Sequence, residues 1–520
     1  MEYQGKKNIR PGFSMLNKTY YDVVLFSPPS RMVNHYRPPL GLLYLGGYLK
    51  HRGKSVKIID VPIKEQVRNA AFFKNISPIL EEIHKKMISG FNELKTRIVG
   101  ISCYTPEFYE TLLLAKTVKK IDPSVIVVVG GVHPTLYPQD FFNEDTGVDV
   151  CVLGEGEEAL ADICDSLISR KDGNLKDIAG IVFKDKTTGQ VVFTAPRPLV
   201  RDLDTISHPD YSLIDMDYYT TANPYAIRGC FLRSMYLLST RGCPSQCTFC
   251  VAKKLRPFNG TGRSRSAESL ISELKVLKKE HGIDAFYFID DLFTINKENV
   301  KRFCSLMKKE KLGLLWGCSS KVSTLNEDLI AEMSRSGCVQ IDFGVECGSD
   351  EALTRIKKGI NVAMIKKTFS LCNKYGVRTF ANILVNLPGE TEKDLEDILR
   401  LLDDIKPEIV SFNIFTPYPG TEIYDNCGFV FKKEDYAALS KPTVELLEGD
   451  PARFRFCCHE VDLQAWVRRQ WKLYNKTWAN IKFYLDLRYL ILIMRSKNKK
   501  NYLVQLSLLL REFINQKYSN

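Results

Sequence analysis

Hydrophobic and polar positions alternate along the chain in two separate series of strand-like and helix-like segments. In the first series, between residues 20 and 172, short runs rich in Val and Ile are separated by segments with apolar residues at helical spacing. The runs are YDVVLFS, SVKIID, RIVGIS, VIVVVGG and VDVCVLGEG. Each ends in Gly, Pro, Ser or Asp, as loops at the carboxyl ends of parallel strands do. Five such strands predict a flavodoxin-like, Rossmann-type α/β domain.

The alternation stops between residues 173 and 232, where IAGIVFKD and VVFTAPRP flank a TTGQ turn. This pattern predicts a β-hairpin followed by a proline-bearing linker. A second alternation covers residues 233–425, with the strand-like runs SMYLLST, AFYFID, LLWGCSS, VQIDFGV, RTFANILV and EIVSFNIF. Six strand-helix units in series predict a partial (β/α)6, TIM-like barrel with its chemistry at the carboxyl ends of the strands. Residues 426–520 predict a mostly helical C-terminal region that is basic and aromatic.

The net charge of +12 does not by itself indicate a nucleic-acid partner, because the excess is concentrated in the tail. Residues 461–520 contain twelve Lys and Arg against three Asp and Glu. The aromatic residues among them are Trp466, Trp471, Trp478, Phe483 and Tyr484. Such helices either lie on an anionic membrane surface or pack on the barrel. We expect no nucleic-acid partner, and the lack of a secretory signal or an apolar stretch of spanning length favours a cytoplasmic protein with peripheral membrane contact as an option.

A three-cysteine motif follows the first strand of the second series. Fifteen cysteines in a chain without an export signal do not indicate a disulfide framework, so spacing has to identify the functional ones. The segment STRGCPSQCTFC places Cys243, Cys247 and Cys250 in a C-x3-C-x2-C pattern. Three thiolates hold three irons of a [4Fe–4S] cluster and leave the fourth iron open. The alternative is a zinc site, which requires a fourth Cys or His nearby, and neither follows closely. Cys457 and Cys458 lack such spacing, and we interpret them as ordinary residues.

The cysteine motif, with an aromatic residue before its last cysteine, resembles the radical SAM superfamily over roughly residues 233–425. The resemblance implies that the open iron binds S-adenosylmethionine (SAM), whose reductive cleavage releases methionine and a 5′-deoxyadenosyl radical. It also implies polar contacts with the cofactor from later strand ends. For the SAM ammonium it indicates one of Asp290 and Asp291, although a helix cap or a solvated pair is the alternative.

Two further strand ends in the second series carry polar residues that the resemblance assigns to the cofactor. Glu346 in DFGVECGS is the candidate for the ribose hydroxyls, and Asn386 opens the NLPGET turn after the fifth strand. Two positions depart from the family pattern, because Asn386 and Lys321 stand where related sequences often carry Gly and Arg. The departures concern the polar contacts of the cofactor and not its presence.

The first series resembles the cobalamin-binding domain that is fused to some radical SAM domains. A flavodoxin-like sheet suits a corrin, because its nucleotide tail can lie between strands where glycines permit close approach, and Gly130, Gly131 and Gly154 stand at such strand ends. The alternative is that these glycines serve only turns and helix starts. The D-x-H-x-x-G motif that ligates cobalt from below is absent. We therefore expect no histidine ligand and interpret His133 as structural, which by resemblance favours methyl transfer.

Together the resemblances predict a radical SAM enzyme that uses SAM, a [4Fe–4S] cluster and cobalamin to methylate an unactivated carbon of a small-molecule or lipid substrate. An electron donor such as flavodoxin or ferredoxin is implied. One alternative is a cobalamin-dependent radical cyclase or oxidoreductase, similar to the anaerobic magnesium-protoporphyrin monomethyl ester cyclase. Methylthiolation of tRNA is another, but those enzymes carry three more clustered cysteines, whereas Cys103, Cys151 and Cys164 are dispersed. A non-enzymatic iron–sulfur or cobalamin sensor is the last, and the sequence does not identify the substrate.

Overall fold

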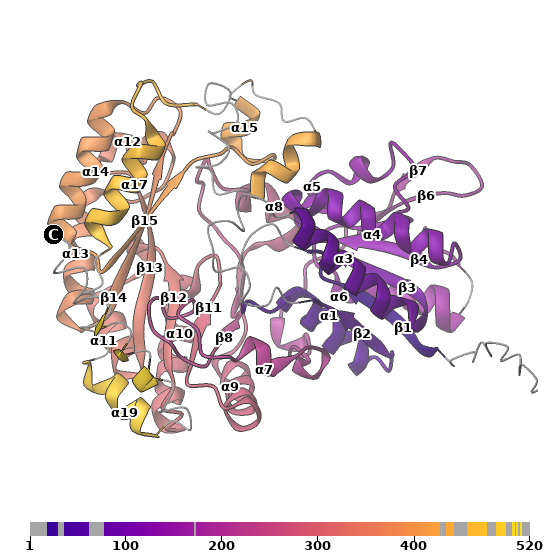
Figure 1. Ribbon diagram of the computed structural model, residues 1–520, viewed down its shortest axis with the longest axis horizontal. Coiled ribbons are helices and arrows are strands. Elements are labelled where there is room, and N and C mark those ends of the chain that lie inside the picture. The colour runs from indigo at the N-terminus through magenta and orange to yellow at the C-terminus, as the bar shows by residue number, and fades with distance from the viewer. Residues whose placement is uncertain are drawn as a thin grey trace, which may run out of the picture.

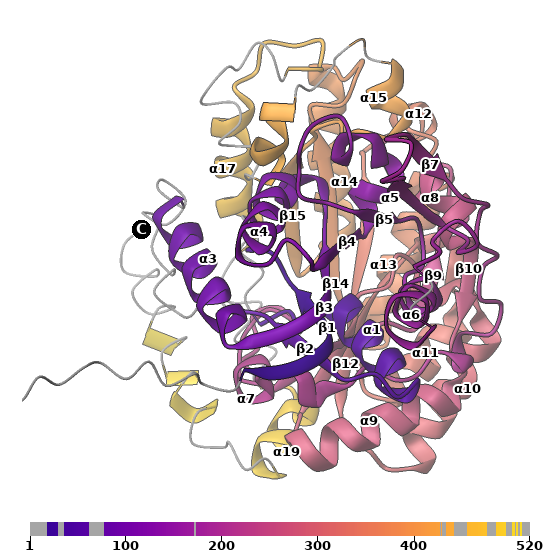
Figure 2. The same ribbon diagram turned by 90° about the vertical axis from the view of Figure 1, so that its right-hand side faces the viewer.

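The computed structural model describes residues 18–29, 36–61, 77–170, 173–426, 428, 433–440, 455–475, 485–495, 502–504, 506–507 and 510–511. Two parallel sheets lie next to each other along the long axis of the molecule, each with helices packed against it (Figure 1). Seen from the end of the molecule, the N-terminal sheet lies in front of the second sheet (Figure 2). The carboxyl ends of the parallel strands in the first sheet face the second domain, since residues of both line one cavity.

Seven strands form the N-terminal sheet in the order β2-β1-β3-β4-β5-β6-β7. The strands β1 to β5 are parallel to one another. Their runs of Val and Ile are buried because helices cover both faces, as is usual for central parallel strands. The order β2-β1-β3-β4-β5 confirms the flavodoxin-like domain. The bounds are β1 Thr19–Phe26, β2 Val56–Ile59, β3 Leu94–Ser102, β4 Ile126–Gly130 and β5 Val150–Val152.

The expected hairpin is present and extends the N-terminal sheet. It consists of β6 (Ile181–Lys184) and β7 (Val191–Phe193). Strand β6 pairs antiparallel with β5, so the hairpin belongs to the first domain's sheet and not to a separate linker. The pairing has a physical reason, because it covers the edge of β5 that would otherwise present unpaired backbone groups.

The second sheet contains six parallel strands in the order β15-β14-β13-β12-β11-β8, which follows the chain. This arrangement confirms the partial barrel. Its strands are β8 Ser234–Leu237, β11 Ala285–Phe288, β12 Leu315–Ser320, β13 Cys338–Glu346, β14 Arg378–Val385 and β15 Ile409–Ile414. Two short antiparallel strands, β9 (Thr240–Gly242) and β10 (Thr261–Ser264), flank the cysteine motif.

Helices alternate with the strands in both domains, as the apolar spacing predicts. In the first domain they are α1 Leu40–His51, α3 Ser77–Asn92, α4 Phe108–Ile121, α5 Val132–Leu136 and α6 Glu157–Cys164. In the connection and the barrel they are α7 Met216–Tyr219, α8 Ala252–Asn259, α9 Ala267–His281, α10 Lys297–Lys309, α11 Glu327–Arg335, α12 Asp350–Arg355, α13 Val362–Lys374, α14 Glu392–Ile405 and α15 Glu422–Asn426.

The described part of the C-terminal region packs on the barrel. Helix α17 (Leu463–Tyr474) lies on β15, where Trp466 meets Phe412 edge to face at 5.4 Å between ring centroids. Asn475 then closes the sheet edge, because its amide accepts from the nitrogen of Val410 (2.9 Å) and donates to its carbonyl (2.8 Å). Helix α19 (Leu487–Arg495) follows. The packing alternative is thus confirmed for α17.

Trp478, Phe483 and Tyr484 lie outside the described residues. Among the helices that are described, none combines the length and the apolar character needed to cross a bilayer.

We expect Trp466→Ala to lower the free energy of unfolding by about 2 kcal/mol, because a half-buried indole leaves its contact with the barrel. Trp471, on the same helix, has a side chain that is 55% exposed, so Trp471→Ala should change stability by less than about 0.5 kcal/mol. Urea unfolding followed by circular dichroism measures both. Equal effects of the two variants would contradict the docking of α17 on β15.

Candidate functional site

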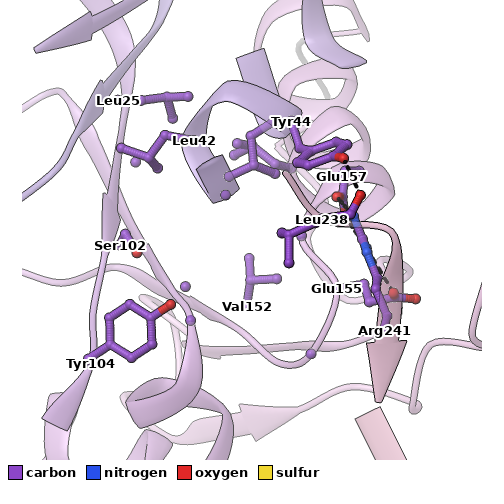
Figure 3. Close-up of a pocket in the computed structure, with 18 of the residues that line it drawn as sticks. Leu25, Leu42, Tyr44, Ser102, Tyr104, Val152, Glu155, Glu157, Leu238 and Arg241 are labelled. Atoms are coloured by element: carbon purple, nitrogen blue, oxygen red, sulfur yellow. Dashed lines mark hydrogen bonds and ion pairs between the residues drawn. The ribbon is translucent and has the colours of Figure 1, made fainter. Parts of the chain in front are cut away.

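A cavity of about 390 Å³ lies between the two domains. Its size is within the range of ~300–1,000 Å³ that is usual for cofactor sites. The carboxyl ends of β1, β3, β4 and β5 contribute one wall, and the segment from Leu238 to Gly242 contributes the other. Aliphatic side chains and glycines line most of it, with Tyr44 and Tyr104 at its sides (Figure 3). A largely apolar site of this size at strand ends suits an organic cofactor.

The three glycines expected to approach a cofactor all line this cavity. Gly131 has a φ of +112°, and a Cβ there would lie 2.8 Å from the carbonyl oxygen of Cys103. Gly154 has a φ of +78°, and its Cβ would lie 3.1 Å from Cβ of Phe258. The backbone therefore requires both. A Cβ at Gly130 meets only Val152 at 3.8 Å, so this glycine keeps the cavity open without being required by the turn.

No histidine lines the described part of the cavity. His133 is completely buried beside it, where its ring contacts Phe108 at 4.9 Å and Tyr436 at 5.2 Å between centroids. Its Nδ1 forms a hydrogen bond with Oγ1 of Thr105 at 3.1 Å, and burial lowers the pKa of the imidazole. His133 is therefore a packed core residue.

Four charged side chains join the cavity wall to the start of the cysteine loop. Arg241 binds Glu155 (Nη1–Oε1, 2.8 Å) and Glu157 (Nη2–Oε1, 2.5 Å). Arg263 also binds Glu155, at 2.8 Å from Nη2 to Oε1. Burial alone would raise the pKa of Glu155, but the two guanidinium groups more than offset this and the pKa is lowered. The sequence analysis missed this network, because the residues come from different domains and only the tertiary structure brings them together.

The three cysteines lie on the loop between β9 and α8. The first of them, Cys243, is two residues after Arg241 in the sequence. Arg256 shapes the loop, since its guanidinium donates to the carbonyls of Cys243 (3.2 Å) and Ser245. Burial raises the pKa of Cys250 to about 11, and the nearby negative charges of Asp291, Cys247 and Cys243 add to the shift. A bound metal must therefore displace the protons from closely neighbouring thiols.

Among the described residues, Glu390, Cys457 and His459 form a group whose ligand atoms all lie within 4.8 Å of one another, and the three cysteines of the loop do not form such a group. A [4Fe–4S] cluster takes each of three thiolates on a different iron, so it does not require them to surround a single ion.

Two lysines face the cysteine loop from the barrel. Lys358 binds Glu346 (Nζ–Oε1, 2.6 Å) and lies 5.4 Å from the ring centroid of Phe249. Burial alone would lower the pKa of Lys358, but Glu346 and Cys247 more than offset it and the pKa is raised. Lys321 donates to Oγ of Ser245 at 3.2 Å, and burial lowers its pKa. Lys321 thus supplies a cation where related sequences often have Arg, and the sequence analysis missed Lys358.

The neighbouring aspartates at the end of β11 point in different directions. Asp290 is 3% exposed and accepts from the backbone nitrogens of Ser239 (2.7 Å) and Thr240 (3.0 Å). Burial raises the pKa of Asp290 to about 6, although these hydrogen bonds by themselves would lower the pKa. Asp290 thus anchors the segment that leads into the cysteine loop. Asp291 is exposed and lines the cavity. Only Asp291 offers its carboxylate to a ligand there.

Asn386 is fully buried, and its side chain is used within the protein. Its Nδ2 donates to the carbonyl of Phe415 at 3.0 Å, and its Oδ1 accepts from the nitrogen of Phe456 at 2.9 Å. The backbone has a φ of +72°, which explains why Gly and Asn both suit this position. The cofactor contact expected of Asn386 is therefore replaced by a bond to the C-terminal segment. From the same C-terminal segment, Nε2 of His459 lies 3.1 Å from Oε1 of Glu390.

Comparisons with known proteins support both halves of the site. Residues 237–402 match the model of the radical SAM superfamily, and residues 32–164 match the B12 binding domain. An uncharacterized methyltransferase of Pyrococcus horikoshii is 32% identical over 78% of this chain and 82% of its own. The anaerobic magnesium-protoporphyrin IX monomethyl ester cyclase of Rubrivivax gelatinosus is 27% identical over 80% and 73%. The radical SAM methyltransferase TsrM of Kitasatospora setae, a solved structure at 16% identity, shares the fold with a TM-score of 0.61 over 79% of each chain.

We expect Glu155→Gln to lower the free energy of unfolding by about 3 kcal/mol at neutral pH, because it removes the carboxylate that pairs with Arg263 and leaves Arg241 with Glu157. A lowered folded-state pKa stabilises the fold above the unfolded value and loses that effect as the pH falls. The difference from wild type should therefore shrink below about pH 4. Glu158→Gln is the control, since Glu158 is 44% exposed and binds Arg197 at the surface. Urea unfolding at neutral pH and at several values below about pH 4 tests both variants, and a difference that stays constant throughout this acidic range would contradict the assignment.

Proposed function

This chain belongs to the radical SAM superfamily and carries a B12-binding domain, and from this premise we propose that it methylates an unactivated carbon of a small-molecule substrate. The observation that carries the proposal is the junction of the two sites. The cavity wall contributed by the B12-binding domain is bonded through Glu155 to Arg241, which lies two residues before Cys243. The residues proposed to hold the methyl carrier and those proposed to hold the source of the radical are thus joined by this ion pair.

The chain's residues fit the three groups that this family uses. We propose that Cys243, Cys247 and Cys250 hold the [4Fe–4S] cluster, that Asp291, Glu346 and Lys321 contact SAM, and that Gly130, Gly131 and Gly154 receive the nucleotide tail of cobalamin. When bound, the cluster supplies an electron to SAM and cobalamin supplies a transferable methyl group. The lysines at the cysteine loop balance the charge of its thiolates, and the apolar cavity keeps water from the reacting groups.

The chain's similarity to a tetrapyrrole cyclase supports a second candidate, a cobalamin-dependent radical cyclisation or oxidation. The nature of the product separates the two, because only methyl transfer adds a carbon from SAM. An electron donor such as flavodoxin or ferredoxin, and a cytoplasmic location, are further parts of the proposal. A purely sensory role would not require a carboxylate and two lysines beside the cysteine loop.

We expect the anaerobically reconstituted protein, given SAM labelled in its methyl group, cobalamin and a reductant, to transfer label to material from a cell extract. Replacing the three cysteines by Ala should abolish both label transfer and 5′-deoxyadenosine, because no cluster forms. Cys458→Ala is the control, since Cys458 is exposed and outside the loop. Liquid chromatography with mass spectrometry measures product and 5′-deoxyadenosine. Iron retained in the triple variant at about four per chain would refute the assignment.

The outer face of α19 is the surface through which the protein would contact a membrane, and a lipid substrate would reach the protein through that contact. Leu487 and Met494 are 69% and 71% exposed, while Tyr489 between them is completely buried. We propose that this apolar face and the basic tail dock reversibly on an anionic membrane. Several Lys and Arg contribute about 1 kcal/mol each near such a surface at low salt.

We expect the wild type to sediment with liposomes that contain phosphatidylserine at low salt and to be released at high salt, because salt shortens the Debye length. Leu487→Ser combined with Met494→Ser should reduce the bound fraction several-fold. The matched control is Leu113→Ser, since Leu113 is 52% exposed on α4 of the other domain. Binding that is absent, or equal in all three proteins, would eliminate the membrane proposal.

A further inference from the structure

The contacts of the barrel strands reveal which side chains point inward. Phe286 and Phe288 on β11 contact Phe303 on α10, at 6.3 and 5.5 Å between ring centroids. Tyr287 lies between them and must point to the opposite side, into the barrel. Phe412 on β15 likewise contacts α17 through Trp466. Its neighbours on the strand therefore face the barrel lumen.

Several inward positions toward the carboxyl ends of the strands are polar and accessible. Ser319, Asn382 and Ser411 are partly exposed and Asn413 is exposed, although helices cover the outer face of the sheet. Asn382 is in register with Ser411, and Asn413 follows two residues later on β15 in register with Leu384. Asn382, Ser411 and Asn413 thus form a short polar strip beside the apolar Leu384. Hydroxyl and amide groups covered by a hydrocarbon would lose their hydrogen bonds to water at a cost of about 1–3 kcal/mol each. The strip therefore favours a polar ligand.

An arginine lies within this lumen with much of its side chain accessible. Arg228 is 43% exposed, stacks 4.1 Å from the ring centroid of Phe380, and binds Oδ2 of Asp342 through its Nε at 3.2 Å. Its backbone nitrogen donates to Oε1 of Gln340 at 2.9 Å, which holds the residue in position. Within the described residues, no group accepts a hydrogen bond from its two terminal nitrogens. The guanidinium is thus oriented and offers its free edge to a ligand.

A second guanidinium reaches the same space from the N-terminal domain. Arg37, just before α1, is exposed and lies 5.1 Å from the ring centroid of Tyr236 on β8. Tyr236 in turn contacts Tyr287 at 6.3 Å between centroids. The side of the lumen that faces the cobalamin domain is therefore also positively charged.

We propose that the barrel lumen binds a polar substrate through an oxyanion, a carboxylate or a phosphate, held by the terminal nitrogens of Arg228. Arginine pairs with such groups through two parallel hydrogen bonds, which fixes orientation as well as position. The amide and hydroxyl strip then contacts the remainder of the substrate, and Arg37 closes the side toward the first domain. This inference rests on the proposed methyl transfer and narrows its substrate class, because it excludes neutral lipids.

The site is tested directly on the wild-type protein by phenylglyoxal, which modifies accessible arginines, with each position quantified by peptide mass spectrometry. Succinate or inorganic phosphate at a few times its dissociation constant should slow modification of Arg228 roughly fivefold, and the neutral dimethyl succinate should not. Protection by only one of the two anions identifies the oxyanion. Arg302, which is 59% exposed on α10, is the control and should react equally under all conditions. Unchanged reactivity of Arg228 with both anions would overturn the proposal.

Methyl transfer to fractionated extract gives the second readout. Label from SAM should appear in the fraction retained by an anion exchanger. Arg228→Gln should reduce it at least tenfold while 5′-deoxyadenosine continues to form, and Arg302→Gln should reduce neither. Label confined to the neutral lipid fraction would overturn the substrate class and leave methyl transfer intact. Label in no fraction would instead overturn the proposed function, and the phenylglyoxal experiment would still decide whether the lumen binds an oxyanion.

Discussion

The ion pairs between Glu155, Glu157, Arg241 and Arg263 are the interaction on which the rest of the site depends. They connect the loop after β5 with the strand that leads into the cysteine motif. Because the charges are largely buried, each needs its partner, and a shift of one domain against the other would leave several of them without one. The cavity and the cysteine loop therefore keep a defined relative position. Chemistry that passes from one cofactor to another requires this constraint.

The cysteine loop is held from several sides by groups of complementary charge. Asp290 binds the backbone just before it, and Arg256 binds carbonyls within it. Lys358 and Lys321 approach from the barrel, where Glu346 and Cys247 raise the pKa of Lys358 and Lys321 donates a hydrogen bond to Ser245 of the loop. Hydrogen-bond donors and charges around sulfur ligands also tune the potential of an iron–sulfur cluster. The surroundings of the loop thus fix its shape and place positive charge beside its cysteines.

The described C-terminal segments complete the barrel at two places. Helix α17 covers β15, and the segment from Arg455 to His459 binds the turn after β14 through Asn386 and Glu390. The turn expected to contact a cofactor is therefore also the attachment point of the chain's last part. The C-terminal region, which the sequence pattern does not connect with the barrel, therefore supports β15 and the turn after β14.

Periodicity and spacing were enough to predict the two parallel sheets, the hairpin, the cysteine loop and the glycines at the strand ends. These features are local, because apolar period, turn residues and loop position are written in neighbouring residues. The roles of single side chains were not predictable in this way. Asp290 and Asp291 are adjacent in sequence and differ only in the direction that the backbone gives them.

Lys358, Arg228 and the Glu155 network were missed for the same reason. Their partners are distant in sequence, and Arg241 and Glu155 come from separate domains. The sequence by itself determined the fold class and the cofactors, since these depend on patterns repeated along the chain. Only the tertiary structure decided which charged groups meet. The partner of each charge depends on which distant segments are buried together and in which register their strands pair.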